Sequence, residues 1–381
     1  MNSTDSTPQT QRGSFVIFAL LLFATLGLLF IKGCQPNQVL FANDGPLGAL
    51  KAEANRPPGI YTGRWEDLNW VGGAIPNPSP NFSALLYTTL SPEAYLNLGA
   101  PASMFLAGLC AWFFFRALRF SPWVCVVGGL AAGLNSNMLS NACWGQNSRP
   151  LSMAMAFLAL GFLHLSRGPF LLRTLPAGLA IGLGVTEGFD IGAMFSICVA
   201  AYLFFYFLVA GKTTGEKWGK AITSVAFVAL FAGIVAYQTI YTLLGTQLKD
   251  VAVMEQKSET PEEKRAKWDF ATQWSISPME TLRVVIPGLF GYRMTDRSGR
   301  VYADSYWGKV GQTPSNPASR FNGSGEYAGV LVVVLAIYGF CVTFRKNGGA
   351  TSLDKKCIWF WSIFAFVCLL LSWGRFAPFY Q

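Results

Sequence analysis

The chain has 381 residues, of which 52% are hydrophobic and 13% are charged, and its formal net charge is +9. Soluble domains carry about 25% charged residues, and here apolar runs near the ~20 residues that cross a bilayer recur along the sequence. These features exclude an ordinary soluble protein. The basic residues are scattered in short loops between the runs, so orientation in a bilayer explains the charge and no nucleic-acid partner is predicted.

The apolar runs predict an all-α polytopic membrane protein with about nine transmembrane helices. Residues 1–14 are polar and predict a disordered cytoplasmic tail, followed by one transmembrane domain over 15–381. The first run lacks a small-residue cleavage site, so we interpret it as a retained anchor. The predicted spans are 15–31, 96–115, 122–140, 150–166, 174–187, 191–210, 221–243, 328–344 and 357–373.

Positive charge marks every second short loop between these spans, and such loops stay in the cytoplasm. The pattern therefore predicts a cytoplasmic N-terminus and two long outer loops, 32–95 and 246–327. The basic residues that carry the prediction are Arg116, Arg119, Arg167, Arg173, Lys212, Lys217, Lys220, Arg345, Lys346, Lys355 and Lys356.

The first outer loop begins with VLFANDGPLGALK, in which Asn43-Asp44-Gly45-Pro46 is strong turn chemistry. A turn alone explains these residues. The alternative is chemical: Asp44 follows the first span by about a dozen residues, and a carboxylate at the membrane boundary can remove a proton from an acceptor hydroxyl. The residues alone leave both interpretations open.

The short loop between the third and fourth spans is NACWGQNSRP, residues 141–150. Trp144, Gln146, Asn147 and Arg149 offer an aromatic face, two amides and one cation, a set that suits sugar hydroxyls and phosphate. An interfacial tryptophan beside a loop arginine explains the same residues equally well.

Other candidate residues lie in the later outer loops. Glu187 and Asp190 follow a short, glycine-interrupted fifth span, where substrate sites tend to be found; they predict either a cation or sugar site or a polar hairpin tip. In the long outer loop, Arg283 and Arg293 are candidates for gripping a lipid phosphate, although cations in such a loop are more often simply solvated.

The eight cysteines show no metal-ligand spacing and no CxxC. Only Cys34 and Cys143 fall in loops on one side, so they are the candidate disulfide pair, and the others are expected to pack as small hydrophobes. The only histidine, His164, lies inside the fourth span and is predicted to be a packed residue.

Several short patterns occur together: FANDGPLG after the first span, WDFATQWSISPMETLRVVIPGLFGY followed by SYWG in the later loop, and LLLSWGRFAPFY at the ninth span. In this order, and with a Pro- and aromatic-rich first outer loop, they resemble the bacterial YfhO-type membrane proteins. The resemblance covers roughly 15–381. That family belongs with the GT-C-type glycosyltransferases, so the resemblance implies a GT-C-like helical bundle.

The resemblance also implies an activity. It indicates a glycosyltransferase of the bacterial cytoplasmic membrane that moves a sugar from a polyprenyl-phosphate-linked donor to a glycan or lipid acceptor on the outer face. Asp44 matches the acidic residue presumed to act as the base, with Asn43 beside it. Family members are usually longer, so we expect the chain to be truncated at its C-terminus.

No cofactor is predicted for certain. Many metal-using members of the wider superfamily carry an acidic residue in the second outer loop, and NACWGQNSR has none. A divalent metal is therefore not supported by that loop, and only Glu187 or Asp190 is left as a substitute.

Two other functions stay open: a transporter or flippase of lipid-linked glycans, and a non-catalytic membrane assembly subunit. An ion-coupled carrier would need charged residues deep within several spans, and these spans are nearly free of charge away from their ends. In the transferase interpretation, Asp44 deprotonates the acceptor while Arg149 and loop arginines hold the donor phosphate.

Overall fold

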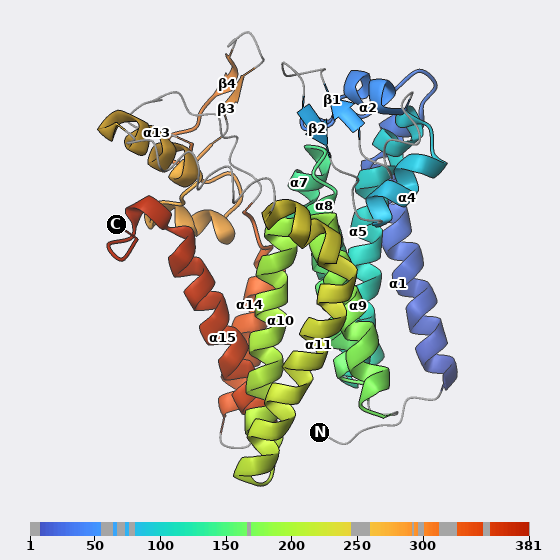
Figure 1. The fold of residues 1–381 in the computed structure, drawn as a ribbon, viewed down its shortest axis with the longest axis vertical. Helices are drawn as coiled ribbons and strands as arrows, with labels where there is room; N and C mark the ends of the chain where they lie inside the picture. Colours follow the sequence, from blue (N-terminus) through green and yellow to red (C-terminus); the bar gives the residue numbers. More distant parts are fainter. Residues whose placement is uncertain are drawn as a thin grey trace. The chain divides into compact units, whose positions relative to one another are not determined.

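The computed structural model is mostly helical, with two short antiparallel hairpins (Figure 1). It divides into two compact units, Asn2–Gln247 and Leu248–Gln381, which we describe separately. The residues described are 8–54, 64–66, 73–75, 81–165, 169–244, 260–291, 293–295, 301–311, 326–345 and 351–380.

The first unit is a bundle of long apolar helices that carries short helices and a hairpin, β1–β2, at one end (Figure 1). The hairpin pairs Trp65 with Ala74. The elements are α1 (Pro8–Leu29), η1 (Ile31–Cys34), α2 (Leu47–Ala54), β1 (Arg64–Glu66), β2 (Gly73–Ile75), α4 (Phe82–Thr89), α5 (Pro92–Ala117), α6 (Pro122–Gly133), α7 (Ser136–Cys143), α8 (Ser148–Leu163), α9 (Leu171–Glu187), α10 (Phe189–Ala210) and α11 (Thr214–Thr242).

Helices α1, α5 and α6 share one apolar core, in which Phe18, Leu22 and Met104 are fully buried. Small residues let these helices approach closely, as is usual where helices pack in a membrane. A Cβ placed on Gly133 would lie 2.9 Å from the Leu22 side chain and 3.1 Å from the Cα of Gly108. The core therefore depends on apolar side chains of one helix filling glycine gaps in the next.

Helices α8, α9 and α10 also pack closely at glycine residues, and one buried hydrogen bond joins α8 to α9. The Ser152 hydroxyl donates to the Gly184 carbonyl at 2.8 Å. A Cβ on Gly192 would lie 2.2 Å from that same carbonyl oxygen, so only glycine lets α10 start this close to α9. This packing sets the position of Glu187, the last residue of α9.

In the second unit, hydrogen bonds connect the first helical region, α13 and η3, to the end of the chain after α15. The Arg375 guanidinium donates to Asp269 at 2.7 Å and to Thr272, and the Trp373 indole N–H donates to Thr281 at 3.0 Å. Two of the sequence patterns quoted for the family resemblance, WDFATQWSISPMETLRVVIPGLFGY and LLLSWGRFAPFY, therefore pack on each other. The elements are α13 (Pro261–Thr272), η3 (Met279–Val284), β3 (Arg293–Thr295), β4 (Val301–Asp304), α14 (Val330–Phe344), α15 (Ser352–Ser372) and η4 (Gly374–Phe376).

Within the described ranges, five helices are long and apolar enough to cross a membrane. They bear out the prediction of a polytopic helical membrane protein, whereas the count of nine stays a prediction. The five are Arg12–Leu29, Pro92–Ala117, Phe189–Ala210, Thr214–Thr242 and Ser352–Ser372.

Some predicted boundaries differ from the structure. The third predicted span, 122–140, is two helices, because the Asn135 side chain accepts the Met138 N–H at 3.0 Å and so caps α7. Helices α8 and α14 have 16 and 15 residues, short of the ~20 of a straight crossing. Helix α1 begins at Pro8, so the predicted disordered tail 1–14 is wrong from residue 8 onward, and residues 1–7 lie outside the described residues.

Candidate functional site

The segment that carries Asp44 is an irregular connection between η1 and α2, with a turn at 36–37 and a bend at 43–45, and α5 holds its first part. The Asn97 side chain accepts the Leu40 N–H at 2.8 Å and donates to the Gln38 carbonyl at 3.2 Å. A Cβ on Gly33 would lie 3.0 Å from Leu40, so this glycine leaves the segment room to turn back. One amide on α5 thus satisfies the backbone on the approach to Asp44.

The second anchor is the loop between α7 and α8. The Asp44 N–H donates to the Trp144 carbonyl at 2.9 Å. The next residue, Gly145, has φ of +95°, and a Cβ there would lie 3.1 Å from Ala42 and 3.3 Å from the Gly45 nitrogen. Glycine therefore meets both a conformational and a steric requirement at this contact.

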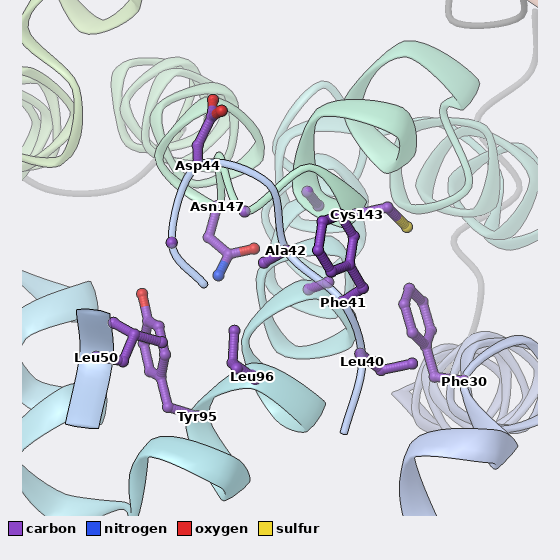
Figure 2. A pocket seen from close by; sticks show the side chains of 14 residues that line it. Phe30, Leu40, Phe41, Ala42, Asp44, Leu50, Tyr95, Leu96, Cys143 and Asn147 are labelled. Atoms are coloured by element: carbon purple, nitrogen blue, oxygen red, sulfur yellow. The ribbon is translucent and has the colours of Figure 1, made fainter. Parts of the chain in front are cut away.

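The Asp44 carboxylate itself is exposed and bound by two amides. Asn43 Nδ2 donates to Oδ1 at 2.9 Å, and Gln146 Nε2 donates to Oδ2. A carboxylate has about four acceptor positions, so two stay available. In Figure 2 the carboxylate extends away from Leu50, Tyr95 and Leu96. Asp44 is thus oriented by polar partners and still accessible.

A pocket of about 280 Å³ lies beneath this turn (Figure 2). Its walls come from Phe30 just after α1, the Asp44 segment, α2, the start of α5, the end of α7 and the α7–α8 loop, and they are mainly apolar. The lining residues are Phe30, Leu40, Phe41, Ala42, Asp44, Gly45, Leu50, Tyr95, Leu96, Ala100, Ala142, Cys143, Gly145 and Asn147.

Asn147 is the buried polar side chain of this pocket. It is 9% exposed, and its Oδ1 accepts no hydrogen bond from any described residue. A Cβ on Gly99 would lie 2.5 Å from its Nδ2, so the glycine on α5 makes room for the carboxamide. Asn147 precedes α8 without capping it through its side chain. Buried polar groups usually have partners, so this one marks a place for a ligand or water.

Trp144 and Arg149, predicted from the same loop, do not line the pocket. The Trp144 indole is 47% exposed, and the residue contributes its carbonyl to Asp44. Arg149 lies in the first turn of α8, is half-buried and pairs with no carboxylate among the described residues. The loop therefore supplies Gln146 and Asn147 to the site directly.

Glu187 is committed to the N-terminus of α4. Its carboxylate accepts the N–H groups of Phe82 and Ser83 and the Ser83 hydroxyl, the last at 2.7 Å. Asn81 donates to the Thr186 carbonyl at 2.9 Å. This anion stabilises the positive end of a helix, which favours the hairpin-tip interpretation over a cation or sugar site. Asp190, in the first turn of α10, is exposed.

These contacts bring three predicted outer loops to one end of the first unit. Asp44 contacts the 141–150 loop, and the α9–α10 turn contacts α4 in the first loop. The alternation of the spans predicts this arrangement. Which side of a membrane this end faces stays a prediction.

The two arginines of the long outer loop belong to the second unit. Arg283 is 2% exposed, with its guanidinium 3.4 Å from Glu280 and 3.5 Å from Glu326. A phosphate would have to displace a buried carboxylate there, so a structural role is favoured. Arg293 begins β3 opposite Asp304, and its side chain lies outside the described part of the chain.

The remaining candidates have clear outcomes. Cys34 and Cys143 are both unpaired, so the structure forms no disulfide between them. His164 packs among Phe114, Tyr202 and Tyr206, with its Nε2 3.0 Å from the Tyr202 hydroxyl, which confirms it as a packed residue. No group of three or more His, Cys, Asp or Glu side chains that could hold a metal occurs in the ranges the structure describes.

Sequence inspection missed Asn97 and Ser83, which hold Asp44's segment and Glu187. Both are single polar residues in helix-forming stretches, and no local pattern separates them from solvent-exposed ones.

Comparison with protein-family models, with curated proteins and with solved structures finds no match to this chain. The resemblance to the YfhO-type family therefore stays a prediction. The class that the fold supports is that of a membrane-embedded helical protein with a polar turn and a pocket at one end of its first unit.

Proposed function

We propose that this chain is a membrane-embedded glycosyltransferase of the bacterial cytoplasmic membrane. It moves a sugar from a polyprenyl-phosphate-linked donor to an extracytoplasmic glycan or lipid acceptor, with Asp44 as the general base. The family resemblance suggests this activity. The observation that supports it best is the Asp44 turn, which is anchored through Trp144 and Gln146 while its carboxylate stays accessible beside a pocket.

The proposed reaction needs one proton transfer and one displacement. Asp44 takes the proton from the acceptor hydroxyl, and the acceptor oxygen attacks the anomeric carbon of the donor sugar. The bond between that carbon and the phosphate oxygen breaks, and polyprenyl phosphate leaves with the electron pair. Because the leaving group is already anionic and stable, the protein has to supply positioning, a base and charge stabilisation.

The neighbours of Asp44 have separate roles in this proposal. Asn43 and Gln146 each bind one carboxylate oxygen and so orient the base. Arg149, which has no carboxylate partner among the described residues, is the nearest cation along the chain to Gln146 and is assigned to the donor phosphate. The exposed indole of Trp144 offers a flat face for a sugar ring.

The test is Asp44→Asn in the full chain, purified and reconstituted with a polyprenyl-phosphate sugar and membrane acceptors. We expect transfer to fall by about 10²–10⁴-fold, the usual range for loss of a general base, while expression and insertion persist. Glu216→Gln is the matched control, because it removes a partly exposed carboxylate that pairs with Lys220 at the start of α11.

Undiminished transfer by Asp44→Asn would contradict the role of Asp44. Movement of the lipid-linked sugar across the vesicle membrane without new glycosidic bonds would contradict the transferase proposal and support a flippase.

A further inference from the structure

The pocket beneath Asp44 has an unusual chemical balance for a site expected to handle a phosphate. Of the 14 residues that line it, none is Lys or Arg, and the one charged side chain is the carboxylate of Asp44 at its edge. A phosphate there would meet a negative charge with no cation to offset it. The pocket is therefore unsuited to the head of the anionic donor.

Its walls suit a hydrocarbon. Phe30 and Ala100 are buried, and Leu40, Leu50 and Leu96 complete the apolar surface around them. The volume of about 280 Å³ is at the lower end of the ~300–1,000 Å³ of sites that enclose a whole small molecule. The pocket has room for one apolar segment of a ligand, and the rest of the ligand would continue past the Asp44 turn.

Asn147 adds a specific polar requirement. The residue is nine-tenths buried, its carboxamide lies among the lining side chains in Figure 2, and its Oδ1 has no hydrogen-bond partner among the described residues. A hydroxyl group suits this carboxamide, because it can donate to the unpartnered Oδ1 and can also accept a hydrogen bond from Nδ2. A purely apolar ligand would leave this buried amide unsatisfied.

We propose that this pocket is the acceptor subsite, and that it takes the apolar segment of a neutral, hydroxyl-bearing lipid. Asn147 binds a hydroxyl of that lipid, and Asp44 stands where the lipid leaves the pocket. The name acceptor subsite rests on the proposed function, but the binding of a neutral lipid can be measured without any sugar transfer.

The experiment is photolabelling of the full chain in nanodiscs with a diacylglycerol that carries a diazirine in its acyl chain. We expect label on peptides from 30–50, 95–100 and 142–147, displaced by excess unlabelled diacylglycerol and not by an equal excess of polyprenyl phosphate. If polyprenyl phosphate displaces the label and diacylglycerol does not, the donor occupies the pocket and the proposal is overturned.

Two leucines on the same helix provide a matched pair of variants. Leu96 lines the pocket, whereas Leu98 is 47% exposed and does not. Leu96→Trp fills the space and is expected to reduce pocket labelling at least about tenfold, while Leu98→Trp leaves it unchanged. Equal labelling of the two variants would overturn the proposal, and their elution profiles on size exclusion show that both fold.

Asn147→Leu tests the polar contact. Labelling by diacylglycerol is expected to fall about tenfold, because a buried hydrogen bond to the hydroxyl is lost. Labelling by the matched probe whose hydroxyl is acetylated should not fall. The variant should also melt no lower than the wild type without lipid, since it removes a buried carbonyl oxygen, Oδ1, that has no partner among the described residues. An equal fall for both probes, or no fall for diacylglycerol, would contradict the role of Asn147.

The two proposals fail in different ways. If labelling misses the pocket while transfer still requires Asp44, the acceptor subsite is wrong and the transferase stands. If diacylglycerol labels the pocket but no glycosidic bond forms with any donor, the lipid site stands and the transferase is wrong.

Discussion

Two acidic residues of this chain, Asp44 and Glu280, differ in the partners that surround their carboxylates. Asp44, in the first unit, is exposed and receives hydrogen bonds from the neutral amides of Asn43 and Gln146. Glu280, in the second unit, is 1% exposed and lies against Arg283.

The partners of Glu280 leave it no free acceptor position. Ser277 donates to it at 2.8 Å, the Lys309 N–H at 2.9 Å, and the Tyr306 hydroxyl also binds it. A Cβ on Gly308 would lie 2.0 Å from Glu280 Oε1, so the backbone closes over the carboxylate. A buried charge of this kind is held in place by the fold and is unsuited to exchanging a proton with a substrate.

The comparison separates two uses of charge. Where amides orient a carboxylate at the surface, its substitution should affect chemistry and leave stability nearly unchanged. Where a cation and hydroxyls enclose it, substitution should affect stability. The following experiments test this separation, from the largest expected effect to the smallest.

Arg283→Met should destabilise the second unit by about 3–5 kcal/mol, because it leaves the buried carboxylate of Glu280 and the half-buried one of Glu326 without their cation. Urea-dependent pulse proteolysis of the reconstituted chain measures this loss. Lys309→Met is the control, since it removes an exposed cation from the same unit and should stay within about 0.5 kcal/mol. A small loss for Arg283→Met would mean that its charge is available to a ligand after all.

Gln146→Leu should lower transfer by about tenfold, because the Asp44 carboxylate loses one of its two orienting hydrogen bonds. We expect kcat to fall while KM changes little, since the residue positions the base. Asn141→Leu is the matched control: its amide lies in the same segment but donates to Asn137. If the two variants behave alike, Gln146 does not act through Asp44.

Glu326 should give the smallest effect, because it involves a single proton. Burial raises the pKa of its carboxyl, partly offset by the Arg283 guanidinium. With the folded pKa above the unfolded one, its stabilisation is complete below the unfolded pKa and is lost as the pH rises through the folded pKa. The stability of the second unit should therefore fall less with rising pH in Glu326→Gln than in the wild type. Identical pH profiles would mean that Glu326 titrates normally.

Part of the fold could be predicted because it depends on composition along single stretches. The runs that became α1, α5, α10, α11 and α15 are long and apolar enough to be recognised alone. The break between α6 and α7 was not predicted, because Asn135 caps a new helix within an apolar run that looks continuous. Short polar signals inside such runs carry too little weight in a hydropathy pattern.

The candidate site shows the same division. Asp44 and Gln146 could be proposed because each lies in a turn-rich loop, yet their contact joins residues 102 positions apart. For Glu187 the sequence left a ligand role and a polar hairpin tip open, and its contacts with the N-terminus of α4 favour the hairpin tip. For Arg283 the sequence left a phosphate contact and a solvated cation open, and the structure instead buries it beside Glu280.

The sequence by itself determined the membrane class, the alternation of basic loops and the turn at Asp44, because hydropathy, charge and turn propensity act over a few neighbouring residues. Only the tertiary structure decided which of the acidic residues stays accessible, which is enclosed, and that an apolar pocket with an unsatisfied Asn147 lies beneath the turn. Burial and hydrogen-bond satisfaction depend on which distant segments pack together, and no local pattern contains that information.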